Sequence, residues 1–296
     1  MDRAEPAGGT LYVVATPIGN LGDVTLRALE VLAAVPLIAA EDTRLSRRLL
    51  ERHSISTRTT SFHARSGPAR LAALLDHLRG GADLALVTDA GTPLVSDPGG
   101  DLVAAWADAG GTVVPIPGPS SVLAAIAASG VAGPRWSFEG FLPRRGRDRR
   151  ERLSRVAGDD RATVLFEAPS RVLATLRDLG AACEPERPAA VCRELTKLHE
   201  QISRGSLRAL ADAVETGAIP ARGEFVLVVG GGAAADGPTG TGDDESLAAA
   251  RAEVEHLVEA GAGRSGAARE VAARTGIPRR RLYAVEPRSS EPADRG

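Results

Sequence analysis

A run of small, polar and turn-forming residues follows a short apolar segment in the first half of the chain. The apolar segment, Leu84–Val87, has the pattern of a buried strand, and residues 88–99 (Thr-Asp-Ala-Gly-Thr-Pro-Leu-Val-Ser-Asp-Pro-Gly) follow it. Open α/β folds bind their ligands at the carboxyl edge of a parallel sheet, where such a loop would lie. Gly91 and Gly99 let a ligand approach the backbone closely, and Asp89 supplies a carboxylate. The loop therefore predicts a ligand site rather than a plain surface turn.

A second loop of this kind, residues 16–23, follows the apolar segment 10–15 and precedes a helical pattern. Its Gly-Asn-Leu-Gly lacks the G-x-G-x-x-G spacing of a dinucleotide fingerprint. Glu41 lies where such folds hold a ribose, about 20 residues further on, which leaves a nicotinamide cofactor as an alternative. A carboxylate at Asp89 would repel a pyrophosphate. Asp23 and Asp89 suit a cationic or zwitterionic ligand better.

Lysine is nearly absent from the chain. Of the 36 basic residues, Lys197 alone is a lysine. Arginine keeps its proton at accessible pH, whereas lysine can lose it, so Lys197 is a candidate for an amine that must deprotonate. Like-charge repulsion from Arg193 or Arg44 would lower its pKa. A contact of Lys197 with a phosphate or with Glu200 is the alternative.

Residues 144–152 hold six arginines in nine positions, just after three aromatic residues, Trp136, Phe138 and Phe141. We interpret this segment as a loop that grips the phosphates of a nucleic acid, with aromatic side chains on which bases stack. A solvated charged face is the alternative, because most charge runs have no other role.

Composition limits the class of protein. The chain has 296 residues and a net charge of −2, so any surface for a polyanion must be local. Cys183 and Cys192 are too few for a disulfide framework or a zinc knuckle, and no metal-ligand spacing is present. No signal peptide or membrane-spanning run is visible. We expect a cytoplasmic protein with no membrane contact and no metal.

Strand and helix patterns alternate, which predicts an α/β fold with mainly parallel sheets. We expect a disordered N-terminus (1–9), two α/β domains (10–117 and 118–232), a linker (233–244) and a helix-turn-helix-like tail (245–296). Expected strands are 10–15, 37–40, 56–62, 84–87, 112–116, 138–141, 163–167, 189–194 and 224–229. Ser120 or Ser121 should cap a helix over 122–128. Three arginines, 279–281, lie in the second helix expected in the tail, which is either a nucleic-acid contact or a capping hairpin.

Five ordered motifs together resemble one family. They are Thr-Pro-Ile-Gly-Asn-Leu-Gly-Asp (16–23), Glu-Asp-Thr-Arg (41–44), the loop 88–99, Pro-Gly-Pro-Ser-Ser (117–121) and Arg-Glu-Leu-Thr-Lys-Leu-His-Glu (193–200). This set is similar to the ribosomal RNA small subunit methyltransferase I family, a branch of the tetrapyrrole-methylase superfamily. The resemblance covers about residues 10–230 and extends to the tail. General tetrapyrrole methylases have Gly-Asp-Pro where this chain has Gly-Thr-Pro (91–93), a departure that favours the RNA branch.

The resemblance implies two α/β domains with S-adenosylmethionine in the cleft between them, and a homodimer. It also implies 2′-O-methylation of a cytidine ribose of 16S ribosomal RNA, at the decoding centre of the small subunit. A methylase of porphyrinoid rings and a non-catalytic RNA-binding assembly factor are the alternatives. The cofactor-binding residues it implies are Pro17, Asp89, Ala90, Gly91, Thr92, Val95, Ser96, Ser120, Ser121, Glu167 and Ala168.

A ribose hydroxyl is a weak acid, so a positioned base should assist its attack on the methyl group. Lys197 is the first candidate, either as that base or as a cation that steadies the developing alkoxide. His199 is a weaker candidate, and Glu41 is an alternative if it faces the cleft. The residues expected to bind RNA are Arg44, Arg144, Arg145, Arg147, Arg149 and Arg150.

Overall fold

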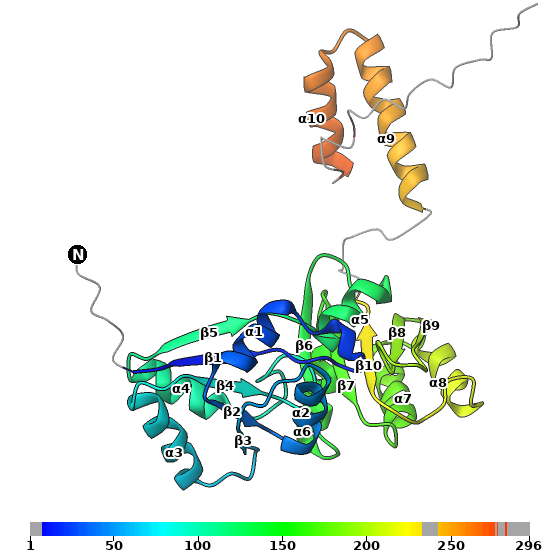
Figure 1. The fold of residues 1–296 in the computed structure, drawn as a ribbon. Helices are drawn as coiled ribbons and strands as arrows, with labels where there is room; N and C mark the ends of the chain where they lie inside the picture. Colours follow the sequence, from blue (N-terminus) through cyan, green and yellow to red (C-terminus); the bar gives the residue numbers. More distant parts are fainter. Residues whose placement is uncertain (1–7, 233–241, 276, 278–281, 283–296) are drawn as a thin grey trace, which may run out of the picture. The chain divides into compact units, whose positions relative to one another are not determined.

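The first half of the chain builds a fully parallel sheet. The computed structural model describes residues 8–232, 242–275, 277 and 282, and the sheet lies in the first of these ranges (Figure 1). The strand order is β3-β2-β4-β1-β5. The strands are β1 (Thr10–Val14), β2 (Leu37–Ala40), β3 (Thr59–Ser61), β4 (Leu84–Val87) and β5 (Thr112–Ile116). All of β4 is buried because helices cover both faces, as expected for a central parallel strand.

Four helices connect these strands: α1 (Leu26–Ala34), α2 (Thr43–Arg52), α3 (Pro68–Arg79) and α4 (Gly100–Asp108). Two apolar clusters, one on each face of the sheet, form the core of this half. The side chain of Thr25 caps α1, and that of Asp42 caps α2. The parallel alternation predicted for this half is confirmed.

The second half builds a mixed sheet of order β6-β7-β10-β8-β9. Only the β6–β7 pair is parallel. The expectation of mainly parallel pairing is therefore wrong here, because β8, β9 and β10 are antiparallel neighbours. The strands are β6 (Trp136–Phe141), β7 (Ala162–Glu167), β8 (Pro188–Arg193), β9 (Gln201–Ser206) and β10 (Phe225–Val229).

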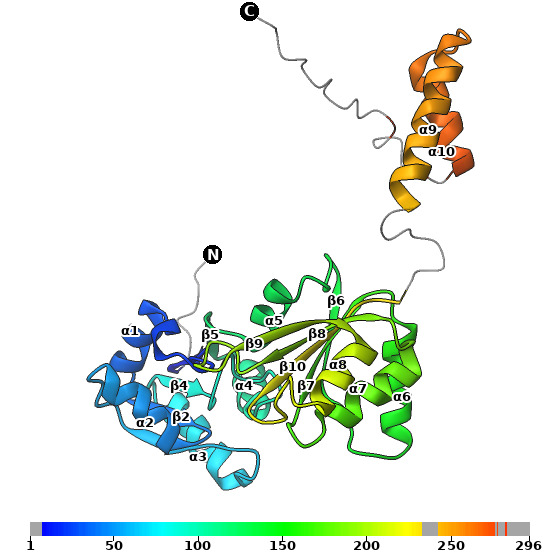
Figure 2. The same cartoon turned by 90° about the vertical axis from the view of Figure 1, so that its right-hand side faces the viewer.

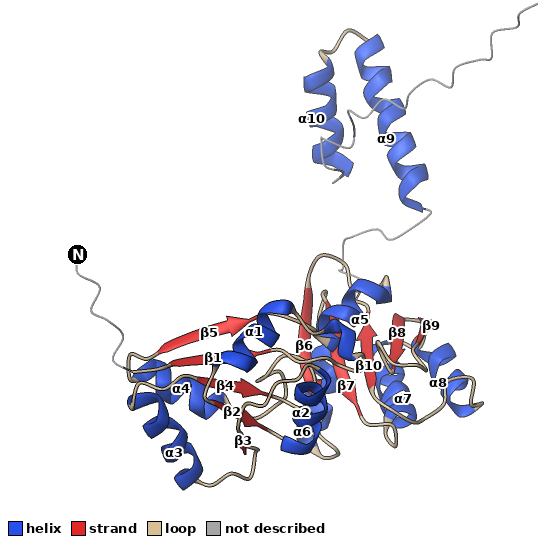
Figure 3. Ribbon diagram, in the orientation of Figure 1, coloured by secondary structure: helices blue, strands red, loops and turns tan. Residues whose placement is uncertain are grey.

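Helices cover both faces of this second sheet (Figures 2 and 3). One apolar cluster joins it to α6 (Arg147–Gly158), α7 (Val172–Cys183) and α8 (Leu207–Glu215). A second cluster joins the other face to α5 (Ser121–Ser129). The Ser120 side chain accepts a hydrogen bond from the Leu123 N–H, so Ser120 is the cap of α5.

The arginine-rich segment is a correction to the sequence interpretation, because it is not a loop beyond Gly146. Helix α6 begins at Arg147, and Leu153 and Val156 are buried on one side of it. Gly146 precedes the helix with a φ of 90°. A backbone turn at this glycine redirects the chain, and the residues that follow include good helix formers and no proline.

The residues from Ala233 onward form a separate unit. Its described part contains α9 (Gly242–Glu259) and α10 (Arg264–Thr275), which pack through an apolar cluster that includes Val254 and Val271. The arginines at 279–281 lie outside the described residues. Among the described residues, no helix is long and apolar enough to cross a membrane.

Candidate active site

The loops that follow β1 and β4 are joined to each other at the carboxyl edge of the first sheet. The Thr16 N–H donates to the Gly91 carbonyl at 2.8 Å, and the Gly91 N–H donates to the Thr16 carbonyl at 3.0 Å. Gly91 has a φ of 84°, and a Cβ there would lie 3.2 Å from Cγ2 of Ile18. The pairing therefore depends on glycine both for conformation and for space.

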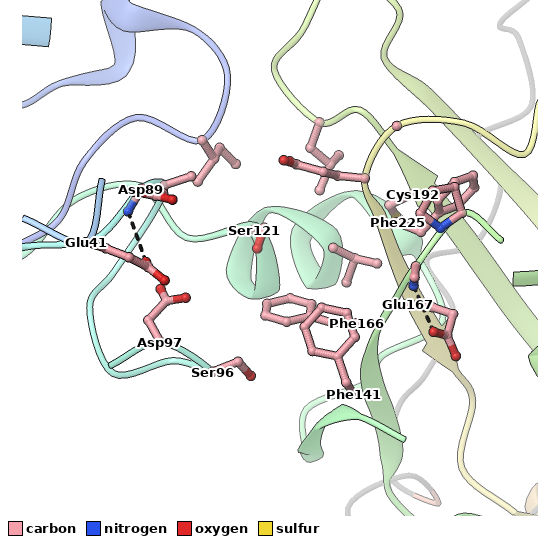
Figure 4. Close-up of a pocket in the computed structure, with 18 residues that line it drawn as sticks. Glu41, Asp89, Ser96, Asp97, Ser121, Phe141, Phe166, Glu167, Cys192 and Phe225 are labelled. Atoms are coloured by element: carbon pink, nitrogen blue, oxygen red, sulfur yellow. Dashed lines mark hydrogen bonds between the residues drawn. The ribbon is translucent and has the colours of Figure 1, made fainter. Parts of the chain in front are cut away.

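A cavity of about 410 Å³ opens between this edge and the second sheet. Figure 4 shows its two walls, with carboxylates on the loops of the first sheet and aromatic rings on the second. The lining residues from the first half are Ile18, Glu41, Asp89, Ala90, Ser96 and Asp97. Those from the second half are Ser121, Phe141, Phe166, Glu167, Ala168, Pro169, Cys192, Leu195, Gly223, Glu224, Phe225 and Val226.

The first wall is acidic, and its carboxylates are close enough to influence each other. The Thr88 hydroxyl donates to Glu41 at 2.8 Å, and the Asp42 N–H donates to Asp89 at 2.8 Å. Burial, together with the smaller effect of the Glu41 and Asp89 charges, raises the pKa of Asp97 to about 6. Burial also raises the pKa of Asp89. Such a wall favours a cationic ligand.

The opposite wall is mainly apolar and partly aromatic, and each of its two carboxylates, Glu167 and Glu224, has a cationic partner. The Phe166 ring lies edge-on to two others, with centroids 5.0 Å from Phe138 and 5.5 Å from Phe141. Phe141 is 54% exposed although it lines the cavity. Burial raises the pKa of the Cys192 thiol to about 11, so this side chain is a small neutral wall residue rather than a nucleophile. The wall suits a flat, uncharged ring.

Lys197 lies at the rim, bound by two carboxylates. Its Nζ is 2.9 Å from Oε1 of Glu194 and 2.9 Å from Oε2 of Glu224. Burial lowers the pKa of Lys197, but the two carboxylates outweigh it and the net pKa is raised. The expected depression by Arg193 or Arg44 is therefore wrong. Lys197 keeps its proton.

The two arginines named for that depression have other partners. The Arg193 guanidinium is buried and donates to the carbonyls of Arg222, at 2.7 Å, and His199, at 3.1 Å. The Arg44 guanidinium is 2.6 Å from the Asp42 carboxylate. His199 is exposed and does not line the cavity.

The structure separates the expected cofactor residues into two groups. Asp89, Ala90, Ser96, Ser121, Glu167 and Ala168 line the cavity, as does the catalytic candidate Glu41. The others are outside the lining: Pro17, Gly91, Thr92, Val95 and Ser120. Thr92 has a supporting position, since its hydroxyl donates to the Pro119 carbonyl at 3.2 Å.

Glu167 has a structural partner set. Its side chain is fully buried and accepts from Arg171 and, at 2.5 Å, from the Thr175 hydroxyl. This carboxylate anchors α7 to β7. Because its partners are internal, the negative charge at the cavity comes mainly from the acidic wall on the first sheet.

Sequence reasoning missed several lining residues. Asp97 stands in the loop 88–99, where its carboxylate was a visible signal beside Asp89. Glu224 and Phe225 carried no motif, and only the pairing of β10 with β7 and β8 brings them to the cavity. Within the described residues, no three His, Cys, Asp or Glu side chains are grouped to hold a metal ion.

The arginine-rich segment divides by burial. The expectation that Arg149 binds RNA does not agree with its position. Its guanidinium is buried, 2.7 Å from the Asp178 carboxylate and 3.0 Å from the Thr175 hydroxyl. Arg147 is exposed but pairs with Glu151. The side chains of three exposed arginines make no hydrogen bond or ion pair with any part of the chain that the structure describes, namely Arg144, Arg145 and Arg150.

The fold, with its cavity between a parallel and a mixed sheet, agrees with the comparisons to known proteins. Residues 10–211 match the family model described as Tetrapyrrole (Corrin/Porphyrin) Methylases. A uroporphyrin-III C-methyl transferase from Thermus thermophilus, solved in complex with S-adenyl homocysteine, has the same fold. The TM-score is 0.55 at 20% identity, over 75% of this chain and 97% of that one.

Two relatives are much more similar in sequence. "Ribosomal RNA small subunit methyltransferase I" of Synechocystis sp. is 47% identical over 93% of this chain and 96% of its own length. The protein of the same name from Mesorhizobium japonicum is 48% identical over 77% of each chain. This chain belongs to the tetrapyrrole methylase family, in the branch named ribosomal RNA small subunit methyltransferase I. The resemblance seen in the five motifs is confirmed.

Proposed function

We propose that this chain transfers the methyl group of S-adenosylmethionine to the ribose 2′-hydroxyl of a cytidine in 16S ribosomal RNA, at the decoding centre of the small subunit. The observation that carries the proposal is the cavity with one acidic and one aromatic wall, in a chain 47% identical to a relative with that name. A homodimer and a cytoplasmic location belong to the same proposal and rest on family membership.

The cavity residues fit S-adenosylmethionine. The carboxylates of Glu41, Asp89 and Asp97 would face its sulfonium and ammonium groups, and the aromatic wall with Phe166 and Phe225 would accept the adenine. The volume of about 410 Å³ is within the usual range of small-molecule sites. When bound, the cofactor supplies a methyl group that positive sulfur has already activated.

The protein's own task is then to align the ribose oxygen and to accept its proton. Of the three catalytic candidates, Glu41 is the one that lines the cavity. Its carboxylate also accepts the Thr88 hydroxyl, which fixes its direction. We assign the proton-accepting role to Glu41. Lys197 remains a cation at the rim, and His199 has no assigned step.

The RNA would be gripped outside the cavity. Arg144, Arg145 and Arg150 are exposed and available to phosphates, and Arg44 is exposed beside Asp42. Arg147 is exposed, but its ion pair with Glu151 competes with a phosphate contact, so it is not assigned to RNA binding. Arg149 is left out because its partners are internal.

The test is methyl transfer with a labelled cofactor to purified small ribosomal subunits, followed by digestion and mass mapping of the 16S RNA. The proposal expects label on the ribose of one cytidine, and a loss of about 10²–10⁴-fold in rate for Glu41→Gln. Label on a base, or transfer to a uroporphyrinogen and not to RNA, would favour the porphyrinoid alternative or another chemistry. RNA binding without any methyl transfer would instead support the alternative of a non-catalytic assembly factor.

A further inference from the structure

A second basic segment lies in the first half of the chain, and the proposed function uses only Arg44 of it. Residues 43–70 contain seven arginines and a single carboxylate, Glu51, in a chain whose net charge is −2. The segment comprises α2, the edge strand β3 and the start of α3. Positive charge is therefore concentrated here, while the remainder of the chain has a net negative charge.

Helix α2 presents most of this charge on one side. Arg47 and Arg48 lie three and four residues after Arg44, and Arg52 lies four residues after Arg48, so the four share a helix face. Leu49 and Leu50 are buried on the other side. We call Arg47, Arg48 and Arg52 the α2 arginine face.

The α2 arginine face has no carboxylate partners in the part of the chain that the structure describes. Its three side chains are exposed and make no hydrogen bond or ion pair with those residues. Three exposed arginines elsewhere have carboxylate partners within 3.0 Å, in the pairs Arg79–Asp76, Arg177–Glu215 and Arg208–Glu186. Three adjacent cations without counter-charges repel each other, so an anionic partner would stabilise this arrangement.

The position of the face connects it to the cavity. Helix α2 starts two residues after Glu41, which lines the cavity, so the arginine face begins within a few residues of the cavity wall along the chain. Phosphate cannot enter easily, because Glu41, Asp89 and Asp97 make that wall acidic. A nucleic-acid strand at the mouth must therefore keep its phosphates outside, where the arginines lie.

We propose that the α2 arginine face binds the phosphate backbone of the RNA strand that carries the methylated nucleotide. The inference rests on the proposed function and adds a second contact surface, on the other half of the protein from Arg144, Arg145 and Arg150. Positions four apart rise about 6 Å along a helix, so Arg48 and Arg52 reach successive points of a strand. Arginine also suits phosphate through paired N–H donors.

The experiment compares two triple variants that remove the same charge. Arg47→Gln/Arg48→Gln/Arg52→Gln removes the face, and Arg79→Gln/Arg177→Gln/Arg208→Gln removes three exposed arginines that have carboxylate partners. Binding to in vitro transcribed 16S RNA is measured by anisotropy against salt. The face variant should lose about 10-fold or more in affinity, and the slope of log K against log salt should decrease by about 2. The control should change either value little.

Two further measurements keep the result interpretable. The triple Lys variant of the face should retain most of the RNA affinity, because charge is kept, and cofactor affinity by calorimetry should be unchanged in every variant. Binding of each variant to phosphatidylglycerol vesicles is measured alongside. The inference would be overturned by an unaltered salt slope, by an equal loss of RNA affinity in both Gln triples, or by a loss of vesicle binding with RNA affinity unchanged. Because RNA binding is measured without methyl transfer, failure of the proposed reaction would be seen separately, in the wild-type transfer assay.

Discussion

Gly19 and Lys197 are in direct contact across the two halves of the protein. A Cβ at Gly19 would lie 2.4 Å from Cγ of Lys197, so the stem of the lysine rests on the glycine backbone. Beside them, the Asn20 N–H donates to the Thr196 hydroxyl oxygen at 3.1 Å. Two motifs far apart in the sequence thus form one rim, next to Ile18 and Leu195, which line the cavity.

Replacing Gly19 by Ala should disturb that rim. The added methyl group has no space unless Lys197 and its loop move, and overpacking of this kind costs about 1–3 kcal/mol. We expect S-adenosylmethionine affinity, measured by calorimetry, to fall roughly 10-fold, since 1.4 kcal/mol is one factor of ten. Gly158→Ala, whose Cβ would meet open space, is the matched control. Unchanged affinity in the Gly19 variant would show that the rim does not shape the cofactor site.

Lys197→Arg distinguishes a cation from a base. If Lys197 acts as a cation, activity should stay within about 10-fold of wild type, whereas loss of a general base costs about 10²–10⁴-fold. The raised pKa of Lys197 predicts the first outcome. Methyl-transfer rates measured from pH 6 to 9 distinguish the two roles. A loss of about 10³-fold would show that Lys197 acts as the general base.

Lys197→Met should lower stability by about 1 kcal/mol in a defined pH range, because the pair is partly exposed. The hydrogen bond from Lys197 lowers the pKa of Glu194, so that contribution exists above 4.5 and fades as pH falls through the lowered value. The contribution of Lys197 exists below 10.5 and fades as pH rises through its raised pKa. The melting temperatures of wild type and variant should therefore differ at pH 7, and the difference should shrink as the pH falls below 4.5.

Asp97→Asn should stabilise the fold and weaken cofactor binding. Burial raises the pKa of Asp97 to about 6, so the ionised form costs free energy above that pH and nothing below 3.8, its ordinary value. The variant should melt higher than wild type at pH 8 and equally at pH 3.5. Calorimetry should show at least about 10-fold weaker cofactor binding, because one carboxylate facing the cation is lost. The exposed Asp108→Asn is the control, and equal behaviour of the two variants would contradict the assignment of the acidic wall.

Phe141→Ala should affect RNA rather than folding. The ring is 54% exposed at the cavity, so its removal costs little core packing. Stacking of a base on an aromatic ring is worth about 1–3 kcal/mol, which predicts a KM for RNA raised roughly 10-fold or more. Phe141→Tyr, which keeps an aromatic ring, should have a KM for RNA close to that of the wild type. Leu123, which is 56% exposed, provides the control Leu123→Ala; a similar KM change there would argue against stacking.

Arg149 and Arg150 are neighbours with opposite expected behaviour. Arg149→Gln leaves Asp178 without its buried partner and should destabilise the protein by about 3 kcal/mol in denaturant unfolding. Arg150→Gln should leave stability within about 0.5 kcal/mol. It should instead reduce the salt slope of RNA binding by about 0.7. A surface role for both residues would require the two variants to behave alike.

The local sequence pattern predicted much of the fold. Strands 37–40, 84–87 and 112–116 have the predicted bounds, because short apolar runs between turn residues can form little else. Strand β9, Gln201–Ser206, was missed since it is polar, and it is an edge strand that pairs with β8 alone. Its formation depends on a neighbour rather than on its own residues.

The sequence by itself determined the family, the ligand-binding loops and the acidic character of the site, because those features are carried by residue types in order along the chain. Only the tertiary structure decided which side chains share the cavity, that Lys197 is held between two carboxylates, and that Arg149 is buried. Proton affinity and accessibility depend on distances between groups from separate elements. Those distances are set by how the loops of one sheet and the strands of the other meet around the cavity, and no spacing along one segment contains them.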